Sequence, residues 1–293
     1  RVAAGSGGRR PPAAHRDPAG LLTYFSTSGT TGEAKLLPIL HGRMAQQARR
    51  APKGCLLMLS SVEHHFVQRS MYYTLFLGEA CAFRGRSRTP VARLCASLRV
   101  DAVGGMVGQI RSLLGEADRH GRLPPGIEVR VTGARSSARL RRELLTRLCD
   151  TVLVIYAAQE CGHIARKSER DPDRVGDSVG PLVAGVEVEI VDEQGAPLPP
   201  GEIGEIRMRA PGMSTGYHGD AAATARHFRD GWFQPGDAAS IAPDGELHVY
   251  GRADDVMNMN GIKIAPLEIE RALERHQAVK AVVAFPLRSP AHG

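Results

Sequence analysis

The sequence lacks any apolar run approaching the ~20 consecutive residues that a membrane-spanning helix needs. It begins at Arg1 without Met, and no apolar run follows, so no signal peptide is visible. Aromatic residues make up only 5%, but 42% of the 293 residues are hydrophobic and 24% are charged. This composition is typical of a soluble globular protein with a sizeable core. We therefore expect a cytoplasmic protein without a membrane span.

Cysteine and lysine are also scarce. The five cysteines (Cys55, Cys81, Cys95, Cys149, Cys161) are odd in number, show no C-x-x-C or zinc-like spacing, and indicate reduced thiols. The 38 basic residues exceed the 31 acidic ones, giving a net charge of +7, yet only five are lysines. The arginines are scattered instead of forming a stripe with aromatics, so we expect no nucleic-acid partner. A solvated basic face, or attraction to polyanionic nucleotides and acids, explains the charge equally well.

Strand-like and helix-like segments alternate in the first part of the chain. Residues 1–20 are rich in Gly, Pro, Arg and Ala and indicate a flexible lead-in. Apolar runs of strand length occupy 21–25, 56–60 and 152–156, and helix-like stretches occupy 89–98, 109–114 and 136–148. The last of these places Leu140, Leu144, Leu145 and Leu148 on one face. This alternation predicts a layered α/β architecture up to about residue 180.

The pattern changes after that point. Residues 186–191 and 204–209 alternate apolar and polar side chains, and Asp244-Gly245 separates two further short runs. These features predict a mainly antiparallel β segment. A helix is expected to begin at 266 and run to 273, and 278–285 is expected to form a strand.

Residues 26–35 combine several hydroxyl side chains with two glycines and a lysine. Gly29 and Gly32 allow backbone N–H groups to turn toward an anion, and Lys35 supplies a positive charge. The spacing of Gly29 and Lys35 does not fit the G-x-x-x-x-G-K-[ST] motif. A phosphate-binding loop is the physical interpretation, and an ordinary mobile Ser/Thr/Gly loop is the alternative.

The order of residues in 24–35 closely resembles the phosphate loop of the adenylate-forming (AMP-binding) superfamily, which includes acyl-CoA synthetases and nonribosomal peptide adenylation domains. Further matches follow in the family's order over most of the chain. They are the adenine-lining segment at 132–134, the Tyr-Gly-x-Thr-Glu motif at 156–160, the Gly-Glu…Gly-Tyr segment at 204–217, the Trp/Phe…Thr-Gly-Asp loop at 231–237, the hinge at 251–255 and the following helix at 261–270.

The resemblance implies a particular domain organisation. After the lead-in over 1–20, a partial large AMP-binding domain would span 21–253, with a layered α/β subdomain followed by a β-rich subdomain from about 181. The start of a small, mobile α+β C-terminal domain, incomplete here, would occupy 254–293.

The resemblance also implies roles for individual residues. Asp237 would accept hydrogen bonds from both ribose hydroxyls, Glu160 would hold Mg²⁺, and Lys35 would steady the departing pyrophosphate. Asp254 would be the hinge of the C-terminal domain. The nucleotide would contact Thr27, Ser28, Gly29, Thr30, Thr31, Gly32, Lys35, Gly133, Ala134, Tyr156, Gln159, Asp237 and Arg252, with Thr31, Lys35 and Glu160 in catalysis. The alternatives are a turn aspartate at 237, a solvated carboxylate at 160, a packing tyrosine at 156 and a surface ion pair at Arg252.

The implied reaction has two steps. A carboxylate attacks the α-phosphate of ATP, which releases pyrophosphate and leaves an acyl-adenylate. A thiol, from CoA or from the phosphopantetheine of an acyl or peptidyl carrier protein, then displaces AMP. Mg²⁺, loop N–H groups and lysines neutralise charge during such chemistry.

The sequence departs from the family's pattern in several places. Gln159 stands where the family has Thr, Ala157 replaces a Gly beside the acyl pocket, and Pro235 replaces a Thr. The phosphate loop begins at residue 26, without the family's long preceding region, and no lysine matches the C-terminal lysine motif used in adenylation. We therefore expect an internal fragment that adenylates poorly or not at all.

The acid is the least determined part. Residues 61–66 contain no Asp to bind an α-amino group and resemble the aromatic-His region of acyl- and aryl-CoA synthetases. His64, His65, Ala157 and Ala158 are the expected acid-pocket residues, with a surface His pair as the alternative. A small-molecule carboxylic acid without an amino group is therefore favoured over an amino acid. An alternative of another class is a degenerate nucleotide-binding module without catalysis.

Overall fold

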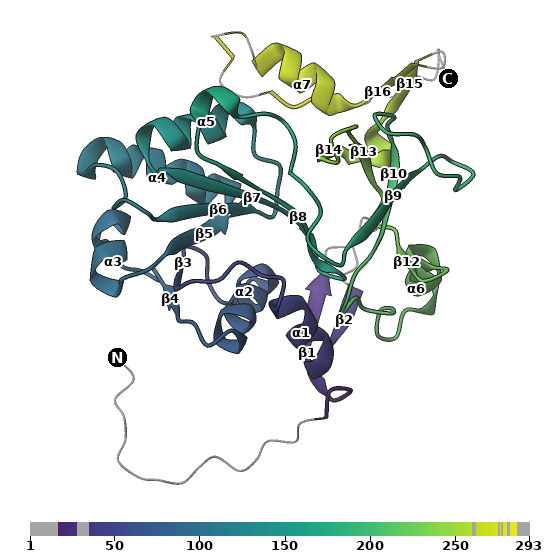
Figure 1. The fold of residues 1–293 in the computed structure, drawn as a ribbon, viewed down its shortest axis with the longest axis horizontal. Helices are drawn as coiled ribbons and strands as arrows, with labels where there is room; N and C mark the ends of the chain where they lie inside the picture. Colours follow the sequence, from purple (N-terminus) through teal and green to yellow (C-terminus); the bar gives the residue numbers. More distant parts are fainter. Residues whose placement is uncertain are drawn as a thin grey trace.

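The structure, a computed structural model, describes residues 17–27, 35–259, 262–274, 276, 278–279 and 282–285. In Figure 1 a layered α/β region lies beside a region of antiparallel strands, and the hairpin of β1 (Leu21–Thr27) and β2 (Lys35–Leu40) lies below the junction between them. This arrangement is the α/β class with a β-rich second part that the sequence predicts.

The first sheet is mostly parallel and has the strand order β4-β3-β5-β6-β7-β8. Neighbouring strands from β4 to β7 are parallel, whereas β8 runs antiparallel to β7. Its strands are β3 (Leu56–Met58), β4 (Cys81–Phe83), β5 (Ala102–Met106), β6 (Glu128–Thr132), β7 (Thr151–Ala158) and β8 (Gly162–Glu169).

Helices cover both faces of this sheet. Side chains alternate between the two faces along a strand. Leu57 and Val103 therefore join the core on one face, whose helices are called the first group, whereas Leu56 and Ala102 pack on the opposite face with Val67. The first group is α3 (Val91–Leu98), α4 (Val107–His120) and α5 (Ala138–Arg147); the opposite face carries α2 (His65–Phe76).

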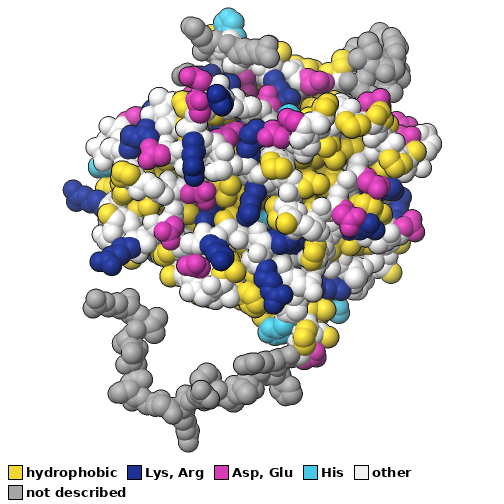
Figure 2. Space-filling view, in the orientation of Figure 1, with side chains coloured by type: hydrophobic (Ala, Val, Ile, Leu, Met, Phe, Trp, Pro, Cys, Tyr) yellow, Lys and Arg dark blue, Asp and Glu magenta, His cyan; other side chains and the backbone are white. Residues whose placement is uncertain are grey.

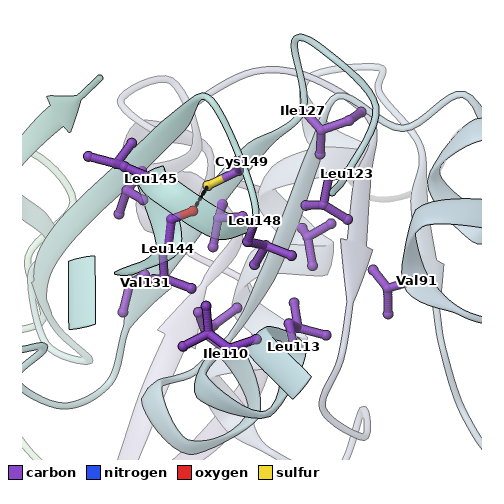
Figure 3. Close-up of a cluster of buried hydrophobic side chains, with 14 of the residues drawn as sticks. Val91, Ile110, Leu113, Leu123, Ile127, Val131, Leu144, Leu145, Leu148 and Cys149 are labelled. Carbon is purple, nitrogen blue, oxygen red and sulfur yellow. Dashed lines mark hydrogen bonds between the residues drawn. The ribbon is translucent and has the colours of Figure 1, made fainter. Parts of the chain in front are cut away.

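Helix α5 shows how the sequence pattern produces this packing. Its leucines at 140, 144 and 145 are buried, and Leu148 and Cys149 just after the helix are buried with them, while Arg139 and Glu143 pair on the solvent side. Figure 3 shows Leu144 and Leu148 in one buried cluster with Ile110 and Leu113 of α4. Burying each leucine of this size contributes about 1.5–3 kcal/mol. The expected apolar stripe is therefore confirmed.

The second sheet is antiparallel, with the strand order β11-β12-β10-β13-β14, and β9 pairs with the other edge of β10. Strands β13 and β14 form the hairpin predicted at Asp244-Gly245. The strands are β9 (Glu187–Val191), β10 (Gly204–Arg209), β11 (Phe228–Arg229), β12 (Trp232–Phe233), β13 (Asp237–Ile241) and β14 (Leu247–Arg252).

A third unit consists of the hairpin β1 (Leu21–Thr27)–β2 (Lys35–Leu40), followed by α1 (His41–Ala48). Thr27 pairs with Lys35, so the paired strands lead directly into and out of the expected phosphate loop. Phe25 and Leu37 pack with Tyr217, which comes from the segment before α6 (Ala221–His227) of the β-rich part. This core joins the hairpin to the rest of the molecule.

The C-terminal elements are the hairpin β15 (Met257–Met259)–β16 (Ile262–Ile264) and helix α7 (Pro266–Glu274). The helix is confirmed where it was predicted. The strand expected over 278–285 is wrong for the described residues 278–279 and 282–285, which pair with no strand. A strand needs a partner for its backbone groups, and the Ala284 N–H instead donates to the Glu270 carboxylate of α7.

Short 3₁₀ helices lie at Pro172–Arg174 and Ala253–Asp255. On the face shown in Figure 2, the Lys and Arg side chains stand singly among acidic and neutral ones and do not gather in one patch. None of the helices built from the described residues has both the length and the apolar character needed to cross a bilayer.

Candidate functional site

A pocket of about 430 Å³ opens where the two sheets meet. Its wall includes residues at the carboxyl ends of the parallel strands, namely Gly133 and Ala134 just after β6 and Tyr156 and Ala157 near the end of β7. The opposite wall comes from the β13–β14 hairpin with Asp237 and Arg252. Crevices outside the carboxyl ends of parallel strands are common ligand sites in α/β folds. Six residues expected at the nucleotide or the acid from distant parts of the sequence thus line one pocket.

Asp237 is the centre of this pocket's hydrogen-bond network. The Tyr156 hydroxyl donates to Asp237 Oδ2 at 2.7 Å, and Arg252 Nη1 donates to Oδ1 at 3.0 Å. Burial and the nearby Asp237 carboxylate raise the pKa of Tyr156 well above its usual range, so the hydroxyl stays a proton donor. A carboxylate accepts about four hydrogen bonds, so Asp237 retains acceptor sites for a ligand's hydroxyls.

Gly236 explains how Arg252 approaches so closely. Its φ of +82° lies in the left-handed region that glycine adopts easily, and a Cβ there would stand 2.6 Å from Arg252 Nη2. Arg252 Nη1 also donates to the Pro235 carbonyl at 2.7 Å. The Pro-Gly-Asp turn thereby holds the guanidinium against Asp237.

Glu160 lies in the turn between β7 and β8 and is only 7% exposed. Its Oε1 accepts a hydrogen bond of 2.8 Å from the Tyr217 hydroxyl. Burial raises the pKa of Glu160, whereas that hydrogen bond and the cations of Arg69 and Lys35 lower it. The pKa of Glu160 lies above its usual value on balance, because burial is the largest of these influences.

The donor set around Glu160 can be tested against Mg²⁺. In the described part of the chain, no three His, Cys, Asp or Glu side chains converge to hold a metal ion. Mg²⁺ is usually held by one or two carboxylates together with water and substrate phosphates. A single buried carboxylate beside the end of the phosphate loop fits that pattern, so Glu160 could hold Mg²⁺ only jointly with a phosphate ligand.

Lys35 lies next to Glu160's partner Tyr217. Its Nζ is 5.1 Å from the centre of the Tyr217 ring and 2.9 Å from Nε2 of His227. The remaining loop residues expected at the phosphates, from Ser28 to Gly32, lie outside the described residues. Thr27, the last residue of β1, is described and pairs with Lys35.

Two of the expected residues sit at the edge of the site. Gln159 Oε1 is buried without a hydrogen-bond partner among the described residues, while the Gln159 carbonyl accepts a bond from Arg69. Ala158 follows Ala157 but does not line the large pocket. Asp254 is exposed in the 3₁₀ turn after β14 and lines a separate pocket of about 240 Å³.

The two neighbouring histidines, His64 and His65, lie on either side of the start of α2. His65 begins the helix, and its Nε2 accepts a hydrogen bond of 3.1 Å from the Ser26 backbone N–H. His64 precedes the helix and is exposed. Neither histidine lines the large pocket, so His65 lies beside the base of the phosphate loop and His64 faces solvent.

Sequence reasoning missed three residues around this site. Tyr217 was part of the Gly-Tyr match but had no assigned role, and Arg69 joins α2 to the Gln159 carbonyl. No sequence pattern indicated His227. Of its neighbours in space, Lys35 is distant in the sequence, and Tyr217 is not at a regular helical or strand spacing from it. Only the Gly-Tyr motif offered a signal in advance.

The comparisons with known proteins agree with this geometry. A family model described as "AMP-binding enzyme" matches residues 3–218. The chain belongs to the AMP-binding enzyme family. Among curated members, it is 29% identical over 293 residues to the salicylyl-CoA synthase / salicylate adenylyltransferase of a Streptomyces species, covering 94% of this chain and 52% of that protein. It is 30% identical over 281 residues to enterobactin synthase component E of Escherichia coli, covering 89% and 52%.

A solved structure shows the same fold. The O-succinylbenzoate coenzyme A synthetase of Bacillus subtilis, in complex with ATP and magnesium ion, superposes with a TM-score of 0.78 at 23% identity, covering 90% of this chain and 57% of that one. The chain thus spans about half the length of the relatives that it matches.

Proposed function

We propose that this chain carries the nucleotide site of a ligase that activates a carboxylic acid with ATP. The observation that supports it most directly is the pocket in which Gly133, Ala134, Tyr156, Asp237 and Arg252 meet. The resemblance in the sequence predicts each of these residues at the nucleotide. The relatives, which include a salicylyl-CoA synthase / salicylate adenylyltransferase, support the same class.

In this proposal the adenosine occupies the large pocket. The ring of Tyr156 and the backbone of Gly133 and Ala134 enclose the adenine, and Asp237 accepts hydrogen bonds from the ribose hydroxyls. Because Arg252 already neutralises Asp237 in part, the carboxylate keeps its acceptor sites without presenting a full negative charge to the phosphates. Arg252 has further N–H groups for the ribose or the α-phosphate.

The phosphates would extend from this pocket toward Glu160 and Lys35. Glu160 would hold Mg²⁺ jointly with the phosphates, and the ion would supply charge neutralisation for the transfer. Lys35 attracts the departing pyrophosphate, and the backbone N–H groups near residues 28–32 are the expected oxyanion donors. The acid's carboxylate oxygen bonds to the α-phosphorus as the bond to pyrophosphate breaks. A thiol of CoA or of a phosphopantetheine arm then attacks the acyl carbon and displaces AMP.

We further propose that the acid lacks an α-amino group, since the stretch around His64 and His65 offers no aspartate to bind one. A second function, nucleotide binding without catalysis, is favoured by one observation. Gln159 stands where the family has a phosphate-binding Thr.

Acid-dependent ATP–pyrophosphate exchange distinguishes these functions. We would measure it on this chain and on the protein encoded by its whole reading frame, across fatty, aryl and amino acids. Exchange that depends on one acid and is lost in Glu160→Ala supports the ligase and identifies its substrate class. AMP binding that Asp237→Ala abolishes, without exchange for any acid, supports the binding module. Exchange by the 293-residue chain alone would contradict the expectation that it adenylates poorly.

A further inference from the structure

The ammonium group of Lys35 is held by a neutral partner. Lys35 Nζ lies 2.9 Å from Nε2 of His227, and within the described part of the chain it forms no ion pair with a carboxylate. Its other close neighbour is the face of the Tyr217 ring, at 5.1 Å. Both contacts orient a cation, and neither cancels its charge.

The protonation state of His227 follows from its second ring nitrogen. Nδ1 lies 2.8 Å from the Gln234 carbonyl oxygen, which can only accept a hydrogen bond. Nδ1 therefore carries the proton, and Nε2 presents its lone pair to the Lys35 ammonium. A protonated imidazole could not accept this bond, so the contact with Lys35 requires neutral His227.

The surrounding structure fixes the imidazole ring. His227 is the last residue of α6, whose first turn is capped by Asp220, which accepts a bond of 2.8 Å from the Ala223 N–H. The backbone N–H of Gln234 donates to the His227 carbonyl at 2.8 Å, so the two residues are joined twice. The rings of Tyr217 and Phe233 stand 6.0 and 6.3 Å away from the imidazole, centre to centre.

The charges facing His227 also favour its neutral form. Burial lowers the pKa of the imidazole, and so do the cations of Lys35 on β2, Arg226 on α6 and Arg252 on β14; only the hydrogen bond to the Gln234 carbonyl acts in the other direction. The ring is therefore neutral at pH 7, the state that the Lys35 contact requires.

We propose that His227 is a positioning residue, which in its Nδ1-protonated form holds the Lys35 ammonium beside the phosphate loop and leaves its full charge for the polyphosphate. This inference rests on the proposed function, because it gives Lys35 a phosphate to bind. A carboxylate in place of His227 would hold the lysine more tightly but would compete with the phosphates for its charge. A neutral acceptor avoids that competition.

Three variants separate positioning from packing, with the KM for ATP measured in the acid-dependent exchange reaction. His227→Leu removes the acceptor and should raise the KM for ATP about tenfold, with a smaller effect on kcat. His227→Gln offers a neutral oxygen and should stay within about threefold of the wild type. His227→Glu should raise the KM more than His227→Leu does, because it neutralises Lys35. If packing alone mattered, Gln and Glu would behave alike, and that result would overturn the proposal.

The pH profile provides a second readout. In the wild type, kcat/KM for ATP should fall as the pH drops below 6.5 toward the lowered pKa of His227, because the protonated ring releases and repels Lys35. His227→Gln does not titrate and should lose this part of the profile. An unchanged acid limb in His227→Gln would contradict the proposal. His218→Gln is the matched control, since His218 is exposed in the same region and its ring contacts Tyr24.

A measurement without turnover separates this inference from the proposed function. In ¹⁵N-histidine-labelled chain, the His227 signal should show a protonated Nδ1 and an unprotonated Nε2, and Lys35→Met should shift the Nε2 resonance. If these hold but no acid supports exchange, the proposed function fails and the His227–Lys35 contact stands. A protonated Nε2, or no response to Lys35→Met, overturns the inference whatever the exchange assay shows.

Discussion

The hydroxyl of Tyr156 donates to Asp237 Oδ2 at 2.7 Å, and this bond joins the last parallel strand of the first sheet to the β13–β14 hairpin of the second. The two residues are 81 positions apart in the sequence. Both residues line the large pocket, so the hydrogen bond that connects the two sheets also shapes the candidate nucleotide site.

Tyr156→Phe tests the two roles of this residue separately. The substitution keeps the aromatic ring and removes a hydrogen bond to a carboxylate, so we expect a loss of about 1–2 kcal/mol in the free energy of unfolding. AMP affinity should change by less than about threefold if the ring, not the hydroxyl, contacts the base. Urea unfolding and calorimetric AMP titration measure the two effects. A large loss of AMP affinity with unchanged stability would contradict this assignment.

Glu160→Gln should separate metal-dependent chemistry from folding. The amide has nearly the same shape, accepts the Tyr217 hydrogen bond, and removes the desolvation penalty that raises the pKa of Glu160. We expect stability to be unchanged or slightly higher, and Mg²⁺-dependent pyrophosphate exchange to fall by about a hundredfold. Thermal unfolding and exchange at several Mg²⁺ concentrations test this. Full activity in the variant would remove Glu160 from the metal site.

His163 should make the protein sensitive to acid. Burial, together with the cations of Arg69, Arg166, Arg50 and Arg130, lowers its pKa from 6.5 to about 3. The unfolded chain therefore takes up a proton below about pH 6.5, while the folded protein resists it until about pH 3. The contribution of His163 to the free energy of unfolding is fully present above pH 6.5. It falls by up to about 1.4 kcal/mol per pH unit as the pH drops from about 6.5 to about 3.

Urea unfolding between pH 7 and pH 4 measures this slope. A variant without the imidazole, His163→Asn, should lose about one proton's worth of the pH dependence. His120→Gln, at an exposed position on α4, serves as the control and should keep the wild-type slope. Equal slopes for wild type and His163→Asn would show that the buried histidine does not control acid stability.

Arg135 should control how firmly α7 stays docked. Its guanidinium lies 3.1 Å from a Glu270 carboxylate oxygen and 3.7 Å from a Glu274 one, and all three side chains are partly exposed. Such pairs contribute up to about 1 kcal/mol, so Arg135→Ala should leave the global unfolding midpoint nearly unchanged. Limited proteolysis after residue 253 should become faster. Charge exchange in the double variant Arg135→Glu/Glu270→Arg should restore protection, and failure to do so would point to packing instead of charge.

Much of the fold was predictable because local patterns match the final environment. The continuous apolar run at 152–156 became the buried β7, and the alternating run at 204–209 became β10. The strand expected over 278–285 had a suitable composition, but whether it forms depends on a partner that the local pattern does not specify. The antiparallel strand β8 was not predicted for a related reason. Its pairing with β7 depends on a turn at Glu160, and the sequence pattern there indicated only a site residue.

The candidate site divides in the same way. Asp237 and Arg252 lie in motifs whose order indicates the family, so their proximity could be anticipated. His227 could not, because its importance comes from the orientation of one imidazole between the Gln234 carbonyl and the Lys35 ammonium. Hydrogen-bond orientation of this kind leaves no periodic pattern in a sequence.

The alternation of side chains along β2 has a consequence for how this site fails. Lys35 shares a strand face with Leu37 and Ile39, which are buried. Leu36, which lies between Lys35 and Leu37 and points to the other face, is 44% exposed. Shifting the hairpin by one residue would turn the lysine outward only by exposing both of those apolar side chains to water. A shift in this register therefore prevents folding, and a well-folded chain with a misdirected lysine does not accumulate.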